Sequence, residues 1–244
     1  MPQGWSPDAT NKHGYRCEEF DQNSELAVMY LGDSCVEGFH YPATEIFSGI
    51  TTKYLTTKFG VRVGNWNMGL RGASLDTITR TIWCSAQFLC PDIAIVVIPQ
   101  MARREFFDLR GNRRAVDRDY CILVGRGDMK PEKQSDEDST YINNWPPLDS
   151  PHDDAVNIVK NLKIIQSTFD QLGITWGYCT NNYYDWPEII GSYRENGWLN
   201  SENYLGFDFD IIDHVSDTDI HPGPKSHKLF GERLFDWIVA RYPT

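Results

Sequence analysis

The chain has 244 residues, a length that α/β proteins reach as one unit with loop insertions, so we expect one domain. Its net charge of -11 argues against partners that bind clustered Lys and Arg, namely nucleic acids and anionic membranes, and favours a small or neutral substrate. Hydrophobic residues make up 41% of the chain, and no window approaches the roughly 18 consecutive apolar residues of a transmembrane helix.

The first 23 residues are polar and lack a basic stretch followed by an apolar one. We therefore expect no secretory signal and synthesis in the cytoplasm. The segment 1–23 is predicted to be an extended arm whose Trp5 and Tyr15 contact the rest of the protein. The domain itself is predicted to span 24–244.

The six cysteines show no CxxC pair and no repeated spacing. This pattern favours reduced thiols over a disulfide framework or a zinc site. Cys84, Cys90 and Cys179 fall in predicted helices or strands, where a free thiol behaves as a small hydrophobic group.

The first predicted strand is the apolar run 27–31, which breaks at Gly32. It is followed by a short loop that presents Asp33 and Ser34. Apolar residues at helical spacing then predict a helix over 44–59, and Gly60 ends it.

The second predicted strand, 61–67, leads into a glycine-bearing turn at 69–72. A helix over 74–89 follows, with Ser74 as its N-cap. The most apolar run of the chain, 93–98, is rich in β-branched residues. Such runs are typical of central parallel strands that are covered on both faces.

Regular patterning is lost over a polar insertion at about 108–152. A connection of this length is typical of an active-site lid, an insertion or a mobile segment. Regular patterning resumes with an amphipathic helix over 153–172 and a strand over 174–179.

The last part of the chain opens with an aromatic-rich loop that runs from Tyr183 to Tyr204. It is followed by a short strand at 209–213 and a helix at 224–242. Strand and helix alternate five times, so we predict an α/β three-layer sandwich with a five-stranded parallel sheet.

Ser34 is the candidate nucleophile, because open α/β sheets bind ligands outside the carboxyl ends of their strands. A serine nucleophile needs a base, an acid that orients the base, and donors for the oxyanion. The best base is His221, in a loop between the last strand and the last helix. Loops that follow successive parallel strands meet at one edge of the sheet, and Asp219 or Asp217 is in position to orient the imidazole.

These residues belong to an ordered set of motifs that resembles the SGNH (GDSL) hydrolases. The motifs are Gly32-Asp33-Ser34 with Gly38, then Asn67-Met68-Gly69-Leu70-Arg71-Gly72, then an acid and His221-Pro222 ahead of the last helix. The resemblance implies a flavodoxin-like sheet and an ester hydrolase. It makes Ser34 the nucleophile, His221 the base, and the backbone N–H groups of Ser34 and Gly72 two oxyanion donors.

The chain departs from the family pattern in two places. The family's third block places Gly-x-Asn-Asp after the central strand, and its asparagine donates to the oxyanion, whereas this chain reads Pro-Gln-Met-Ala-Arg-Arg-Glu over 99–105. Gln100 or Arg103 is the substitute donor, or the enzyme is weak, since losing one donor costs about 2.7–4 kcal/mol in other enzymes. In the last block the commoner Asp-x-x-His spacing would require an acid at position 218, which is Thr, so we assign the acid to Asp219 ahead of Asp217.

Nearby polar residues have simpler interpretations. Asp33 is expected to shape the turn by accepting backbone hydrogen bonds, and Cys35 to be a small buried filler. His227, the competing base, is expected to be a packing or capping residue of the last helix. His40 and His152 have no partner at a useful spacing and are expected at the surface.

The predicted function is a serine ester hydrolase that forms an acyl-enzyme and uses no metal or cofactor. The predicted substrate is a small acyl ester, of which an O-acetyl group on a glycan is one candidate, because the aromatic stretch either offers faces that suit sugar rings or packs the loop down. The alternative is a weak or inactive module with the same fold that binds glycans or is structural. A flavodoxin-like nucleotide binder fits poorly, because the loop after the first strand lacks a phosphate cradle.

Overall fold

The computed structural model describes residues 10–101, 103–107, 121–124, 151–181 and 186–242. Its central sheet has four parallel strands: β1 (Leu26–Leu31), β2 (Val63–Asn67), β3 (Ile93–Ile98) and β6 (Thr175–Thr180). Their spatial order is β2-β1-β3-β6, so the chain starts near the middle of the sheet and then builds outward in both directions.

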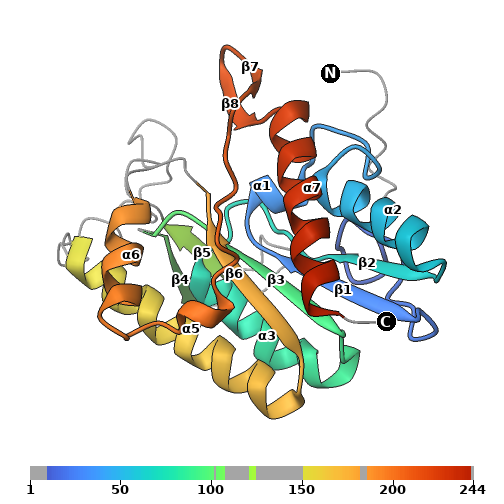
Figure 1. The fold of residues 1–244 in the computed structure, drawn as a ribbon. Helices are drawn as coiled ribbons and strands as arrows, with labels where there is room; N and C mark the ends of the chain where they lie inside the picture. Colours follow the sequence, from blue (N-terminus) through green and yellow to red (C-terminus); the bar gives the residue numbers. More distant parts are fainter. Residues whose placement is uncertain (1–9, 102, 108–120, 125–150, 182–185, 243–244) are drawn as a thin grey trace.

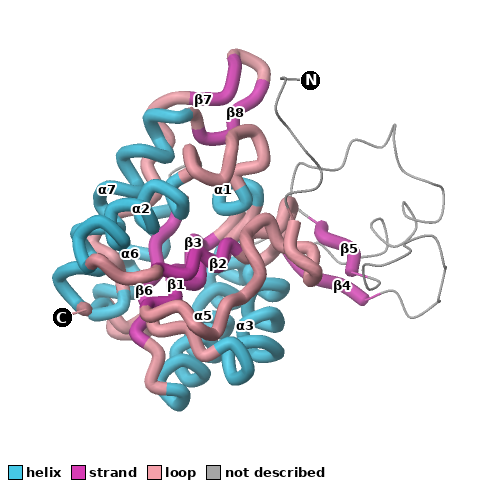
Figure 2. The backbone as a smooth tube through the Cα atoms, turned by 90° about the vertical axis from the view of Figure 1, so that its right-hand side faces the viewer, coloured by secondary structure: helices cyan, strands magenta, loops and turns pink. Residues whose placement is uncertain are grey.

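Helices cover both faces of the sheet, which gives three layers (Figures 1 and 2). The helices α2 (Phe47–Phe59) and α7 (Pro224–Arg241) pack together on one face, and α3 (Leu75–Leu89) and α5 (Pro151–Leu172) pack on the other. Every residue of β1 and β3 is buried, as expected for continuous apolar runs in a parallel sheet. The prediction of a three-layer α/β architecture is confirmed. Among the described residues, none of the helices is both long and apolar enough to cross a membrane.

The prediction of a fifth strand at 209–213 is wrong for the sheet as described. Phe209 makes only an isolated parallel bridge to Asn181, at the carboxyl end of β6. A side chain replaces the backbone here, because the Asp208 carboxylate accepts the hydrogen bond of the Thr180 N–H at 2.9 Å. The segment therefore lies beside β6 without forming a ladder.

Regular structure also appears where loops were predicted. The strands β4 (Arg104–Phe107) and β5 (Cys121–Val124) form an antiparallel pair, so the predicted insertion contains a strand, while 108–120 and 125–150 lie outside the described residues. The aromatic stretch contains α6 (Trp186–Glu195) and the short helix η2 (Ser201–Asn203). Tyr193 and Tyr204 pack against the core, whereas Trp198 is 61% exposed.

The N-terminal segment contacts the body of the protein from residue 10 onward. Tyr15 packs against the core as predicted, whereas Trp5 lies outside the described residues. The Arg16 guanidinium donates to the carbonyl oxygens of Glu37 and Gly38 at 3.1 and 2.6 Å. The segment therefore fixes the chain just beyond Ser34.

The described cysteines are free thiols, as the sequence predicted. The expectation that Cys84 and Cys90 are buried fillers is wrong, because both are exposed on or just after α3. Cys179 is buried in β6, as expected for a small hydrophobic group. The side chain of Cys121 lies outside the description.

Candidate active site

Ser34 stands at the carboxyl end of β1, as the first residue of the four-residue helix α1 (Ser34–Glu37). The chain turns sharply here because Gly32 has no side chain: a Cβ there would lie 2.3 Å from Val36 Cγ2. Asp33 accepts a hydrogen bond from the Cys35 N–H at 3.0 Å and so caps the helix. The predicted role of Asp33 in shaping this turn is confirmed.

His221 lies on β8 (Asp219–Pro222), which pairs antiparallel with β7 (His214–Ser216). The sequence predicted a plain loop here; the structure has a hairpin that stands above the sheet next to α7 (Figure 1). Its base is fixed by Asp213, whose carboxylate accepts hydrogen bonds from the N–H groups of Lys225 and Ser226 and from the Ser226 hydroxyl. Partial burial opposes the charge of Asp213, but these hydrogen bonds outweigh it and lower its pKa.

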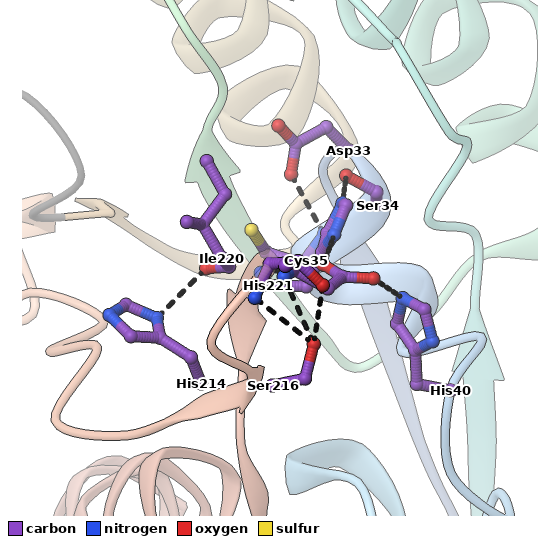
Figure 3. A network of polar contacts seen from close by, with 10 residues as sticks. Asp33, Ser34, Cys35, His40, His214, Ser216, Ile220 and His221 are labelled. Carbon is purple, nitrogen blue, oxygen red and sulfur yellow. Dashed lines mark hydrogen bonds and ion pairs between the residues drawn. The ribbon is translucent and has the colours of Figure 1, made fainter.

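The structure brings Ser34 and His221 together (Figure 3), and Asp219 contacts the other nitrogen of the His221 ring. His221 Nε2 lies 2.9 Å from Ser34 Oγ, and His221 Nδ1 lies 2.6 Å from Asp219 Oδ1. The same Asp219 oxygen accepts the backbone N–H of His221 at 3.1 Å, so one carboxylate fixes both the ring and its backbone. Burial opposes the charge of Asp219, but the hydrogen bonds from His221 lower its pKa and keep it ionised. Asp217, the other candidate acid, is exposed in the turn between the strands.

A second histidine contacts Asp219, and the expectation that His40 is an unpartnered surface residue is wrong. His40 Nε2 lies 3.0 Å from Asp219 Oδ2, an ion-pair distance that lacks hydrogen-bond geometry. Burial lowers the pKa of His40, and this effect outweighs the attraction of Asp219, which would raise it. The lowered pKa favours the neutral ring at neutral pH. No sequence spacing connects His40 to Asp219, because the contact depends on how the hairpin leans over α1.

An aromatic wall flanks the histidines. The Phe39 ring lies 5.2 Å from the His221 ring, edge to face, and 3.8 Å from the His40 ring. The Arg71 guanidinium covers Phe39 at 4.7 Å. The surroundings of His221 on the side of Phe39 are therefore apolar, and the Arg71 guanidinium lies against the Phe39 ring.

The turn after β2 approaches Ser34 and is held by side-chain hydrogen bonds. Asn67 donates to the carbonyl of Val36 at 2.8 Å and accepts from the Gly69 N–H at 3.0 Å. Glu37 accepts the backbone N–H of Arg71 at 3.0 Å. These bonds fix the turn to α1, so the two segments form one rigid edge.

The backbone N–H groups of Ser34 and Gly72 make no hydrogen bond to another described residue, whereas those of the neighbouring Cys35 and Arg71 are used. Gly72 has a φ of 73°, a left-handed conformation that favours glycine. Both predicted backbone donors are thus available for an external acceptor.

The two candidate side-chain donors follow β3, which ends next to β1. Gln100 is buried, with 8% of its surface exposed. The Arg103 guanidinium is held by Asp33, with a 2.8 Å contact to the carboxylate. The cation therefore stands directly behind the turn that carries Ser34.

The remaining sequence candidates lie away from this chemistry or outside the description. His227 is buried in α7 among Phe47 and Phe209, and burial lowers its pKa to about 4, so it is a packing residue as expected. Cys35 is buried, and burial raises the pKa of its thiol, which keeps it protonated. The side chain of His152 lies outside the described residues.

No family model and no curated protein matches this sequence. Solved structures do match its fold over most of the chain. TesA matches with a TM-score of 0.54 and 10% identity over 89% of this chain and 100% of its own. The psychrotrophic esterase EstA from Pseudoalteromonas sp. matches with a TM-score of 0.53 and 10% identity over 89% of this chain and 98% of its own.

The acetyl xylan esterase AlAXEase matches with a TM-score of 0.50 and 10% identity over 86% of this chain and 98% of its own. Other matches across most of the chain include lipolytic proteins of the G-D-S-L family. The matches to TesA and to the two esterases show that this chain shares their fold. At such identities the chemistry has to be argued from the side chains.

Proposed function

We propose that this protein is a serine ester hydrolase with Ser34 as nucleophile, His221 as base and Asp219 as the orienting acid. The main support is that His221 contacts both partners: its Nε2 lies 2.9 Å from Ser34 Oγ, and its Nδ1 lies 2.6 Å from Asp219 Oδ1. A serine hydroxyl is a weak nucleophile until an adjacent base removes its proton as it attacks. The Nδ1–H of His221 donates to Asp219, which leaves the Nε2 lone pair facing Ser34.

The first half of the proposed reaction forms an acyl-enzyme. Ser34 Oγ attacks the ester carbonyl while its proton passes to His221 Nε2. The oxygen of the tetrahedral intermediate accepts hydrogen bonds from the N–H groups of Ser34 and Gly72. Protonated His221, stabilised by ionised Asp219, then gives its proton to the leaving alcohol as the bond to the alcohol oxygen breaks.

The second half of the reaction releases the acid. A water molecule attacks the acyl carbonyl while His221 Nε2 takes its proton, and that proton returns to Ser34 Oγ as the acyl bond breaks. The same two backbone donors hold the second oxyanion. The imidazole thus ends in the state in which it began.

A third oxyanion donor would come from the segment that follows β3. Gln100 and Arg103 are the two candidates, and both follow the strand next to β1. Asp33 holds one guanidinium nitrogen of Arg103, while the planar group has further N–H donors free to turn toward substrate. We therefore place Arg103 ahead of Gln100.

The proposed substrate is a small acyl ester, with an O-acetyl group on a glycan as the leading candidate. The structural match to a protein described as an acetyl xylan esterase supports this choice. Exposed Trp198 offers a flat apolar face of the kind that suits a sugar ring, while Tyr193 and Tyr204 are partly buried.

The test compares hydrolysis of p-nitrophenyl acetate and acetylated xylo-oligosaccharides by wild type, Ser34→Ala and His221→Ala. We expect hydrolysis by wild type and a loss of at least about 1000-fold in kcat/KM in either variant. If wild type and Ser34→Ala behave alike on both substrates, the hydrolase proposal fails. The chain is then better described as an inactive module of the same fold.

A further inference from the structure

Three potential metal ligands meet at one end of the proposed catalytic residues. His40, Asp219 and His221 each offer a ligand atom, and these atoms all lie within 4.8 Å of one another. The cluster combines two imidazoles with one carboxylate, drawn from the segment after α1 and from the β7–β8 hairpin (Figure 3).

The present contacts are already close to the spacing of a zinc site. In tetrahedral coordination, with bonds of about 2.0–2.2 Å, two ligand atoms lie about 3.3 Å apart. His40 Nε2 lies 3.0 Å from Asp219 Oδ2, and His221 Nδ1 lies 2.6 Å from Asp219 Oδ1. Each pair needs to open by less than about 1 Å to admit the ion.

The side chains of the cluster reach solvent in part, while the His40 nitrogen that would bind the ion is itself buried. The three side chains are 20 to 32% exposed. His40 Nε2 makes no hydrogen bond despite its short distance to the carboxylate. The lone pair of an unprotonated His40 Nε2, beside an anionic oxygen, is what a cation would use. The fourth coordination position would fall to water.

We propose that Zn²⁺ binds His40, Asp219 and His221 and reversibly switches off Ser34. The binding stands on geometry alone, and the inhibitory effect rests on the proposed function. Neutral imidazole carries one proton, so zinc on His221 Nδ1 moves that proton to Nε2. Nε2 then donates to Ser34 Oγ and has no lone pair to accept the serine proton. Zinc thereby blocks nucleophilic attack without touching Ser34.

Direct zinc binding is the first test, because it does not depend on any activity. The protein is used without a histidine tag and with Cys84 and Cys90 replaced by Ser, since both thiols are exposed. Cys17 stays, because burial raises its pKa to about 12 and keeps it protonated. Zinc is titrated in competition with a chromogenic chelator.

Three further substitutions in this background test which residues bind zinc. His40→Gln is expected to weaken zinc binding by at least about tenfold, because it removes one ligand of three. Ser34→Ala and His214→Gln are expected to bind like the background protein, although His214 is an exposed histidine of the same hairpin. Equal affinity in the background protein and His40→Gln would overturn the proposal.

A second measurement protects the test against a folding defect in His40→Gln. In the Ser34→Ala protein, zinc is expected to shift the imidazole NMR signals of His40 and His221 and to leave those of His214 in place. Unshifted His40 and His221 signals at saturating zinc would also overturn the proposal.

Inhibition is measured by the rate at which a fluorophosphonate labels Ser34. Zinc is expected to slow labelling at least about tenfold in the background protein, which lacks only the exposed thiols of Cys84 and Cys90, and a chelator to restore it. The same zinc concentration is expected to slow His40→Gln much less, each rate being taken relative to its own zinc-free value. If Ser34 is never labelled, the hydrolase proposal fails while the binding result stands. If labelling is normal but insensitive to bound zinc, the switch fails.

Discussion

Replacing Asp219 with Asn exchanges one carboxylate oxygen for an amide nitrogen at the residue that holds the His221 ring. In the wild-type protein the carboxylate accepts from Nδ1 at 2.6 Å and from the His221 backbone N–H at 3.1 Å. The amide NH₂ group can instead donate to Nδ1 and stabilise the tautomer with its proton on Nε2. His221 then cannot accept the proton of Ser34.

The expected loss in kcat for Asp219→Asn is about 10,000-fold, the size of the effect when the orienting Asp of a serine protease is changed to Asn. This corresponds to about 5.4 kcal/mol of transition-state stabilisation, at about 1.36 kcal/mol per factor of ten. Fold stability should change far less, by about 1–2 kcal/mol, because the side chain is 31% exposed and loses only its charge-assisted hydrogen bonds.

The assay is hydrolysis of p-nitrophenyl acetate, with thermal unfolding as the check on the fold. Asp217→Asn is the matched control, since Asp217 lies exposed in the turn of the same hairpin. We expect its kcat to stay within about twofold of wild type. A loss of less than about tenfold in Asp219→Asn, or equal losses in both variants, would refute the assigned role of Asp219.

Three further predictions concern stability and thiol chemistry. Burial lowers the pKa of His227 from 6.5 to about 4, so as pH falls the unfolded chain takes up this proton before the folded protein does. The free energy of unfolding, measured in urea titrations, should therefore decrease by about 3 kcal/mol between pH 6.5 and 4, and His227→Phe should remove this decrease. The pKa of Asp213 is also lowered, so its contribution to stability is complete above its unfolded value near 3.8 and is lost below it. Asp213→Asn should therefore lower the free energy of unfolding by about 1.5–3 kcal/mol at pH 7 and reduce the further loss of stability at acidic pH. Burial raises the pKa of Cys35, so iodoacetamide at pH 7 should leave it unmodified, as peptide mass spectrometry of the treated native protein would show; modified Cys35 would contradict its burial.

The sequence identified the strands that position the serine because their composition is unambiguous. The runs that became β1 and β3 are continuous and apolar, and only a sheet covered on both faces accommodates them. The segment 209–213 is shorter and carries two aspartates, and among the described residues its only strand pairing is the isolated bridge from Phe209 to Asn181. A carboxylate at 208 then replaced the backbone as the acceptor of the Thr180 N–H, an effect that no periodicity predicts.

The same limit applies to the candidate site. His221 and Asp219 are close in sequence, and their spacing pointed to a shared role. His40 has no such link to Asp219, because the contact arises from the lean of the β7–β8 hairpin toward the segment after α1. The hairpin is held in turn by the hydrogen bonds that Asp213 accepts from Ser226 at the start of α7. No sequence pattern connects these two residues, although they are adjacent in space.

The central claim is that Ser34 is an activated nucleophile, and covalent labelling tests it most directly. A phosphonate is a suitable probe, because its electrophilic phosphorus reacts covalently with an activated serine hydroxyl. The protein is treated with a fluorophosphonate, digested, and the adduct located by mass spectrometry. We expect one adduct, on Ser34, that is absent after His221→Ala. An unmodified Ser34 in wild type, or equal labelling in His221→Ala, would contradict the account.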